Sequence, residues 1–244
     1  MKSPIAPVPR RANLQPLGCY FQGKDLLGEQ YWLFWGICFV GLMIGGVVPI
    51  ILLGPAYCGI GGCFLARAHR KPVTFNTLFE GFDYFTAGLS AILGLVIVAF
   101  VGAIPYVIGL FGGLIMMSTG EPVLAAVGGL ALTVAVIYVL VLNAVVSCGM
   151  LFACLLVVEY RMEGWPAFQT AMSGILKNVW GVTAASVVGQ LLVMLGTMMC
   201  IIPGILMLPM LLAGHFICYQ KIFGGQHLGQ PAKAVPVVQG VYRS

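Results

Sequence analysis

Residues 84–158 of the chain read YFTAGLSAILGLVIVAFVGAIPYVIGLFGGLIMMSTGEPVLAAVGGLALTVAVIYVLVLNAVVSCGMLFACLLVV, and Glu121 is the only charged residue among them. Glu121 divides the stretch into two uncharged runs, 84–120 and 122–158, of 37 residues each. As a helix, such a run would measure about 55 Å, whereas the hydrocarbon core of a bilayer is about 30 Å thick. Each run therefore predicts either one long helix that extends beyond the membrane or two short helices joined by a turn.

The composition of the whole chain indicates a membrane protein. Of the 244 residues, 60% are hydrophobic and 8% are charged, and the mean hydropathy is +1.02. A soluble domain carries about 25% charged residues. The low charge content excludes a soluble enzyme, a disordered protein and a nucleic-acid-binding protein. We expect an all-α integral membrane protein, in which the formal net charge of +5 reflects topology rather than a nucleic-acid partner.

Two further uncharged runs, 30–66 and 178–220, contain helix breakers. Pro49 and Gly54-Pro55 interrupt the first run, and Pro203-Gly204 lies near the middle of the second. Because proline removes a helical hydrogen bond, each of these runs predicts two helices. The predicted polytopic bundle has about six spans, at 31–49, 51–69, 86–113, 123–159, 181–201 and 203–222. Eight spans is the alternative, in which the two central runs also fold into hairpins.

The basic residues predict the orientation of this bundle. All twelve Lys and Arg residues fall on one side of the six-span arrangement. By the positive-inside rule, that side is cytoplasmic and carries both termini. We expect residues 25–224 to form a single transmembrane domain, and the polar tails 1–24 and 225–244 to be flexible and cytoplasmic.

Two segments between the spans, Pro72–Phe85 and Trp165–Val179, place apolar residues at helical spacing. This spacing predicts two amphipathic helices in the cytoplasmic interface, and the alternative is that each is a lead-in turn of the next span. Both segments belong to a weak parallel internal repeat, in which 58–71 aligns with 148–161 and 72–95 aligns with 165–188. Each copy would comprise a membrane helix, an interfacial helix and a second membrane helix.

Four segments carry a resemblance to a known family: LLGPAYCGIGGCFLARAHR at 52–70, VTFNTLFEGFDYF at 73–85, LLVVEYRMEGWPAFQTAMSGILKNVWGV at 155–182 and AGHFICYQKIFG at 213–224. The chain resembles the YciC-like group of uncharacterised bacterial membrane proteins, which is related to the membrane domain beside some glycerophosphoryl diester phosphodiesterases. The resemblance covers about 20–225. It implies a six-helix bundle in the bacterial cytoplasmic (inner) membrane, with no catalytic residues to transfer. The sequence contains no phosphodiesterase domain, so that activity is not inferred.

Polar side chains inside a bilayer mark functional sites by default, because their burial is expensive. His215 is the one ionisable candidate, and Asn143 and Gln190 are the main uncharged ones. For His215, a packing hydrogen bond or an interfacial position is favoured over a ligand or proton site. No acidic residue lies inside a predicted span except Glu159, the last residue of the span 123–159, and this argues against an ion-coupled transporter.

The basic cluster and the cysteines give two further hypotheses. Arg67, Arg70 and Lys71, with Arg161 as a counterpart in the second copy, are candidate contacts for anionic lipid headgroups, although such charge ordinarily sets topology. Most of the eight cysteines lie in apolar helix and are interpreted as structural, so we expect no metal site, no cofactor and no catalytic residue.

Small residues at helical spacing predict close contacts between helices. These contacts lie either within the chain or with a homo-oligomer or membrane-protein partner. The residues are Gly41, Gly45, Gly109, Gly113, Gly181, Ala185 and Gly189.

The favoured hypothesis is a non-enzymatic structural or accessory component of the membrane that associates with another membrane protein or complex. The alternative is a carrier or binding protein for a lipid-like or apolar substrate. A large apolar cavity between the two repeat copies would favour the carrier, and a closed core with one exposed apolar flank would favour the accessory protein.

Overall fold

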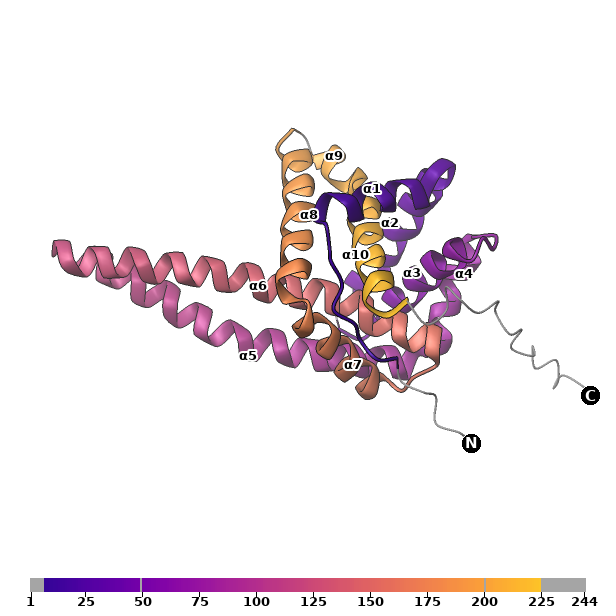
Figure 1. Ribbon diagram of the computed structural model, residues 1–244, viewed down its shortest axis with the longest axis horizontal. Helices are drawn as coiled ribbons and strands as arrows, with labels where there is room; N and C mark the ends of the chain where they lie inside the picture. The colour runs from indigo at the N-terminus through magenta and orange to yellow at the C-terminus, as the bar shows by residue number, and fades with distance from the viewer. Residues whose placement is uncertain (1–6, 49, 200, 225–244) are drawn as a thin grey trace, which may run out of the picture.

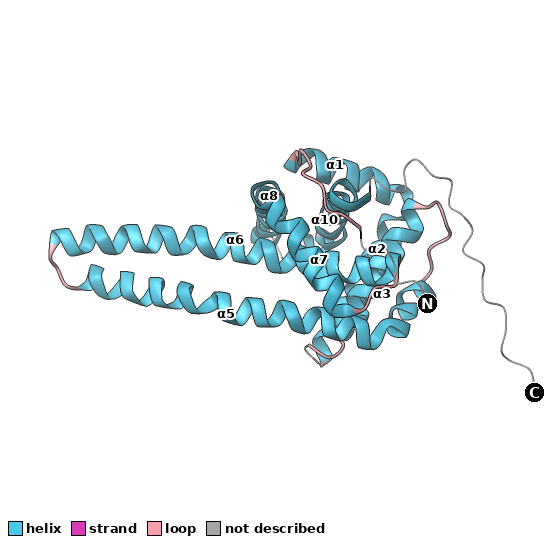
Figure 2. Ribbon diagram, turned by 60° about the horizontal axis from the view of Figure 1, so that its bottom comes forward, coloured by secondary structure: helices cyan, strands magenta, loops and turns pink. Residues whose placement is uncertain are grey.

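The computed structural model describes residues 7–48, 50–199 and 201–224, and all regular structure within them is helical (Figure 2). The all-α helical bundle predicted from the sequence is confirmed. Two long helices project to one side of a body of shorter helices (Figure 1). The body contains α1 (Pro16–Leu27), α2 (Tyr31–Val47), α3 (Leu53–Ala68), α4 (Phe75–Phe79), α7 (Gly164–Lys177), α8 (Val179–Met199), α9 (Ile201–Leu206) and α10 (Leu208–Phe223), with short 3-10 helices at Gly28–Gln30 (η1) and Glu80–Tyr84 (η2).

The two central runs form single continuous helices, so the eight-span alternative is wrong. Helix α5 (Phe85–Ser118) has 34 residues and continues through Pro105, and α6 (Pro122–Tyr160) has 39. The turn between them contains Gly120, whose positive φ of 77° suits glycine, and Pro122 begins α6 where its missing N–H is not needed.

Residues 97–143, which we call the arm, extend beyond the body. Of the residues in the arm only Gly113, Gly128 and Ala135 are buried, and all three lie where α5 and α6 touch. The remainder of α6, from Ala144 onward, runs through the body and is largely buried. The single transmembrane domain predicted for 25–224 is therefore divided into a body and an arm.

Five segments are long and apolar enough to cross a membrane, so the chain is a multi-pass membrane protein. They are Pro16–Val47, Phe75–Ser118, Pro122–Tyr160, Val179–Met198 and Gly204–Phe223. The prediction of six spans is wrong at 51–69. That segment forms α3, whose 16 residues measure about 24 Å, shorter than the hydrocarbon core, and α3 is mostly buried by other helices.

The contacts of α10 contradict the arrangement of the six-span bundle. That bundle places the beginning of α2 and the beginning of the last helix on opposite sides of the membrane. In the structure, the Tyr31 hydroxyl donates a hydrogen bond to the carbonyl of Leu206, just before α10 begins. Basic residues lie at both ends of α10. Lys24 lines a cavity with Met207, which directly precedes α10, and Lys221 lies in the last turn of α10. Basic residues therefore do not lie at one end only of the helices of the body, and the prediction that all of them lie on one side of the membrane stays a prediction.

The flexible tail predicted for 1–24 is, over its described part, packed against the body. Helix α1 runs antiparallel to α10: Lys221 Nζ lies 3.6 Å from Cys19 Sγ, and Gly23 contacts Ala213. Tyr20 is buried, and its hydroxyl donates to the carbonyl of Ala185 on α8 at 2.8 Å. The second predicted tail, 225–244, lies outside the described residues.

The two predicted interfacial segments are helical, but neither lays its whole apolar stripe on a membrane surface. The segment Pro72–Phe85 divides into α4 and η2, and its Leu78 is buried in the protein. Helix α7 forms where predicted, but its stripe residues Phe168 and Ile175 are buried in the body. The bilayer-facing stripe predicted for α7 is therefore wrong, because α5, α6 and α10 cover it.

The internal repeat is present in the order of the elements. Helices α3, α4 with η2, and α5 correspond to α6, α7 and α8. The first helix of each copy is followed by an arginine in the left-handed region, Arg70 (φ 56°) and Arg161 (φ 51°). The packing differs, because Gly59 contacts Leu78 of its own copy whereas its counterpart Gly149 contacts Leu95 of the other copy.

Asn178 fastens the N-terminal segment to the body, and its replacement by alanine tests this role. Asn178 Oδ1 accepts from the Ala12 N–H at 2.8 Å, and Asn178 Nδ2 donates to the carbonyls of Arg10 (2.8 Å) and Gly174 (3.0 Å). We expect Asn178→Ala to weaken this attachment by about 1–3 kcal/mol, because buried backbone groups lose their partners. Trypsin cleavage after Arg11 should then be roughly 5- to 100-fold faster, provided that opening and closing are fast relative to cleavage.

The measurement is limited proteolysis of the detergent-solubilised protein, followed by N-terminal mass analysis. Ser173→Ala is the matched control, because the Ser173 hydroxyl bonds only to Thr170 of its own helix. Equal cleavage of the Asn178→Ala and Ser173→Ala variants would contradict the role of Asn178.

Candidate functional site

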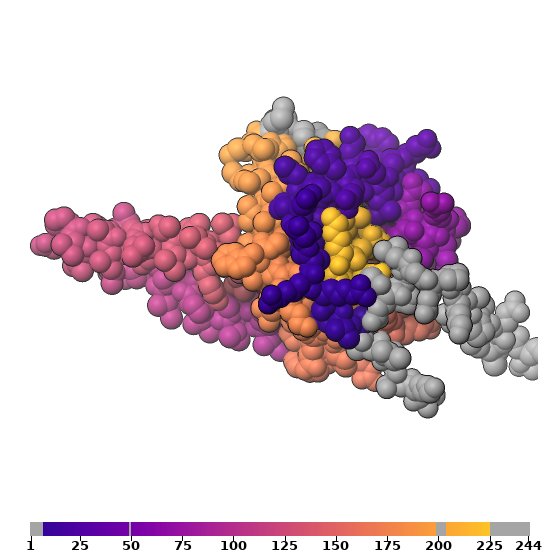
Figure 3. Space-filling view, in the orientation of Figure 1, coloured from indigo at the N-terminus to yellow at the C-terminus, as the bar shows by residue number. Residues whose placement is uncertain are grey.

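The surface of the arm is the main exposed apolar surface of the described chain. Large side chains are exposed along both helices, and they include Phe100, Ile108, Phe111, Ile115, Val123 and Leu130. The space-filling view shows the arm standing clear of the body (Figure 3). In a bilayer, this surface is available to lipid chains and to the membrane helices of another protein.

Polar groups interrupt this apolar surface halfway along the arm. Pro105 has no N–H, so the carbonyl of Val101, four residues earlier, lacks its helical donor. Tyr106 follows directly, and Tyr138 lies level with it, because Gly109 contacts Ala135 and Gly102 contacts Leu142. Neither tyrosine hydroxyl makes a hydrogen bond with another described residue. In hydrocarbon these groups favour a partner that can hydrogen-bond to them.

Asn143 and Gln190 were candidates for a buried polar site, and neither side chain is buried inside the protein. Asn143 is exposed where the arm leaves the body. The side-chain amide of Gln190, on α8, donates to Asn143 Oδ1 at 2.7 Å. The pair therefore forms a polar contact at the root of the arm and satisfies part of the hydrogen-bonding capacity of each amide.

His215 is buried at the centre of the body, as expected for a residue in the last helix. Its Nε2 lies 3.4 Å from the hydroxyl of Ser186, which in turn lies 3.2 Å from the thiol of Cys148. Its Nδ1 has no partner within the described residues. These contacts join α6, α8 and α10, as a packing hydrogen bond would, and the small residue Gly214 beside His215 lets Tyr20 approach α10.

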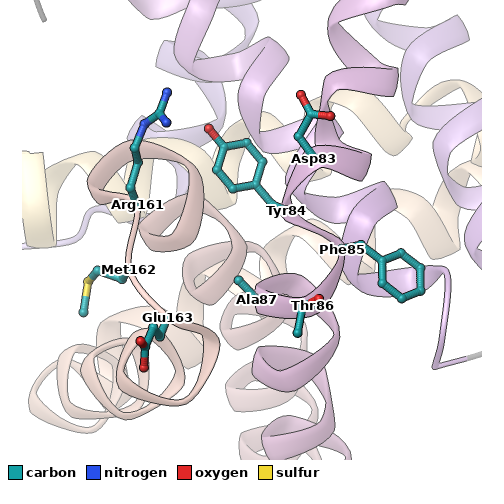
Figure 4. Close-up of a pocket in the computed structure, with 8 residues that line it drawn as sticks. All are labelled: Asp83, Tyr84, Phe85, Thr86, Ala87, Arg161, Met162 and Glu163. Atoms are coloured by element: carbon teal, nitrogen blue, oxygen red, sulfur yellow. The ribbon is translucent and has the colours of Figure 1, made fainter. Parts of the chain in front are cut away.

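A cavity of 360 Å³ lies between the two copies of the repeat (Figure 4). It is lined by Asp83 and Tyr84 of η2, by residues 85–87 of α5 and by Arg161, Met162 and Glu163 after α6. The close-up shows Arg161 and Tyr84 extending on one side of the cavity and Glu163 on another (Figure 4). Its lining mixes the charged side chains of Asp83, Arg161 and Glu163 with the apolar side chains of Phe85, Ala87 and Met162. A cavity for a lipid chain would lack such charges.

The four basic residues proposed for headgroup contacts have different surroundings. Arg67 Nε donates to the carbonyl of Leu26 at 2.9 Å, which gives Arg67 a structural role between α3 and α1. Arg70 and Lys71 are exposed after α3. Arg161 alone lines the cavity between the repeats.

The small residues predicted to mediate helix contacts all contact residues of this chain. Gly41 and Gly45 receive Ile60 and Leu53 of α3. Gly109 and Gly113 form the contact between α5 and α6. Gly181 receives Leu14, whereas Ala185 and Gly189 both meet Tyr20. The intrachain alternative therefore accounts for each of them.

The cysteines occupy packed positions. Seven of them are free and buried in the described part of the chain, and Cys200 lies outside it. Within that part, no group of three or more His, Cys, Asp or Glu side chains is placed to hold a metal ion. Their small apolar side chains fill gaps between helices, as free cysteine commonly does.

Comparison with protein-family models, curated proteins and solved structures finds no match for this chain. The resemblance to the YciC-like group therefore stays a prediction. The structural features of the chain itself must carry any functional conclusion.

Sequence reasoning missed the interrupted centre of the arm and the role of α1. Pro105-Tyr106 lay within the uncharged run 84–120 and was a visible signal, because proline in a membrane helix frees a carbonyl. Helix α1 also had a signal. Pro16 suits the first turn of a helix, and Cys19, Tyr20, Gly23 and Leu27 follow at helical spacing.

The buried contact between Ser186 and His215 predicts a measurable stabilisation. Ser186→Ala leaves both ring nitrogens of His215 without a partner in the core, so we expect a loss of about 1–3 kcal/mol in the free energy of unfolding. Thermal unfolding in one detergent measures it. Ser90→Ala is the matched control, since Ser90 bonds only to Ala87 of its own helix, and should change stability by less than about 0.5 kcal/mol. Equal stability of the two variants would contradict the packing role.

Proposed function

We propose that the protein is a non-enzymatic accessory component of the bacterial inner membrane, which binds the membrane-spanning helices of a partner protein along its arm. One observation carries the proposal. The arm presents bare polar groups at Val101, Tyr106 and Tyr138 in the middle of an otherwise apolar surface. Lipid chains offer these groups no hydrogen bond, whereas a neighbouring membrane helix with a polar side chain does.

The exposed area of the arm supports the same proposal. Gly109, Gly113 and Gly128 are occupied by the contact between α5 and α6, whereas Gly112 and Gly129 face open space. A partner would therefore meet these two glycines and large side chains such as Ile108 and Phe111. Association of this kind gains van der Waals contact and one or two interhelical hydrogen bonds. The arm is therefore suited to binding another membrane protein laterally.

The carrier alternative receives less support. The cavity lined by both repeat copies contains Asp83, Arg161 and Glu163, which would be unfavourable neighbours for an apolar chain. A second cavity of 660 Å³, beside Phe21 and Met210, also contains Lys24 and Asp25. The core around His215 is closed by Phe216, Phe64 and other aromatic rings.

A photo-cross-linking experiment in intact membranes tests the proposal. A benzoylphenylalanine introduced at Ile108, an exposed residue about half a helical turn from Tyr106 on the arm, should yield one discrete adduct with a different protein. The same group at Phe21, an exposed residue of α1, is the control and should not yield that adduct. The combined Tyr106→Phe and Tyr138→Phe changes should reduce the adduct by roughly threefold per hydroxyl, because each interhelical hydrogen bond contributes about 0.6 kcal/mol.

Three outcomes would contradict the proposal. The first is labelling of lipid alone from position 108. The second is an adduct that is insensitive to the two tyrosine changes. The third is an adduct of two copies of this chain, which would replace the partner protein by self-association.

A further inference from the structure

The geometry points to the arm as the only part of the described chain that crosses the bilayer, with the whole body on one side of the membrane. This inference concerns topology and does not depend on the partner proposed above. Five segments are apolar enough to cross. However, α8 and α10 run across the direction of α5 and α6 (Figures 1 and 2). The two groups of helices therefore cannot both lie along the membrane normal.

The length of the arm matches a bilayer. Residues 97–118 of α5 and 122–143 of α6 each measure about 33 Å at about 1.5 Å per residue, against a hydrocarbon core of about 30 Å. Neither segment contains an Asp, Glu, Lys or Arg residue. Large apolar side chains are exposed on both helices. Such a surface is suited to contact with lipid chains around the arm, whereas packing against one protein would cover only one side of it.

Polar groups lie at both ends of the arm. Ser118, Thr119 and Glu121 form the tip and are exposed. At the other end, the amides of Asn143 and Gln190 are joined at the root. Both sets lie where the polar interface of a bilayer would begin, on either side of the hydrocarbon core.

Helix α10 is unsuited to crossing the lipid by itself. Of its most apolar window 56% is buried inside the protein, compared with 11% for the window of α6. One side of α10 is covered by α1, which exposes Gln22, Lys24 and Asp25 outward at positions along α10. A bilayer around this pair would surround charged side chains, and their burial there is expensive.

The basic residues agree with the inference. The N–H of Arg10 donates to the carbonyl of Ile222, at the end of α10, whereas Lys24 and Arg67 lie near its beginning. If α10 crossed the membrane, Arg10 would therefore lie on the side opposite to Lys24 and Arg67. If the arm alone crosses, every described Lys and Arg lies on the side of the body. By the positive-inside rule, that side is cytoplasmic.

The exposed stripe of α8 fits the same arrangement. Helix α8 crosses α6 at the root of the arm, where Gln190 meets Asn143. Beyond this point Leu191, Met194, Leu195 and Met198 are exposed. An apolar stripe beside the root can rest in the bilayer interface with the helix parallel to the surface.

Site-specific labelling in sealed membranes tests the inference with single cysteines at Thr119, Arg11, Asp25 and Met207. Thr119 lies at the tip, Arg11 near the end of α10, and Asp25 and Met207 share a cavity near its beginning. A membrane-impermeant maleimide is added before or after permeabilisation, and the parent chain, whose seven described cysteines are buried, gives the background. We expect Thr119→Cys to label from one side and the other three variants only from the opposite side.

Each alternative arrangement gives a different pattern. A crossing α10 separates Arg11→Cys from Asp25→Cys, and a six-span bundle puts Met207→Cys on the side of Thr119→Cys. Either pattern would overturn the inference. Labelling of all four variants from the same side would overturn it as well, because the arm would then not cross. Thermal unfolding of each variant confirms that the labelled protein is folded. Failure of the cross-linking experiment with a correct labelling pattern would reject the partner and leave the topology intact.

Discussion

The close contact between Gly113 and Gly128 sets how near α5 and α6 can approach, and the arm depends on it. A Cβ on Gly128 would lie 2.6 Å from the carbonyl oxygen of Gly113, and a Cβ on Gly113 would lie 2.9 Å from that of Gly128. The two backbones therefore touch. In lipid there is no hydrophobic force between helices, so such close packing must hold the pair together.

The body is organised around a second close approach, between α1 and α10. Gly214 leaves room for the ring of Tyr20, and Gly23 leaves room for Ala213. Tyr20 then reaches Ala185 on α8, and His215 reaches Ser186 on the same helix. Small residues in both the arm and the body are thus used to bring helices of one chain together, which leaves large side chains on the outside.

The sequence predicted the helices well and their arrangement poorly. Uncharged runs, with Pro49 and the turn at Ser118–Pro122, located the long helices within a few residues, because helix breakers act locally. The contact of Tyr31 with Leu206 could not be predicted, since it joins residues distant in sequence and depends on how α1 turns into α2. Asn143 and Gln190 were misplaced for a related reason: a position within an apolar run does not say whether lipid, protein or the boundary between them surrounds it.

The same ambiguity explains why the two central uncharged runs are longer than one membrane crossing. A run of 37 residues is about 25 Å longer than a bilayer requires, and from the sequence this excess suggested either overhanging helices or hairpins. In the structure, each helix passes from the arm into a packed body, where Val145, Leu151, Phe152 and Leu155 of α6 are buried. Lipid and protein core both exclude charge, and they do so for the same electrostatic reason. An uncharged run can therefore include both a segment in lipid and a segment in the protein core. Only the exposure of its side chains in the structure shows where the lipid-facing segment ends and the buried segment begins.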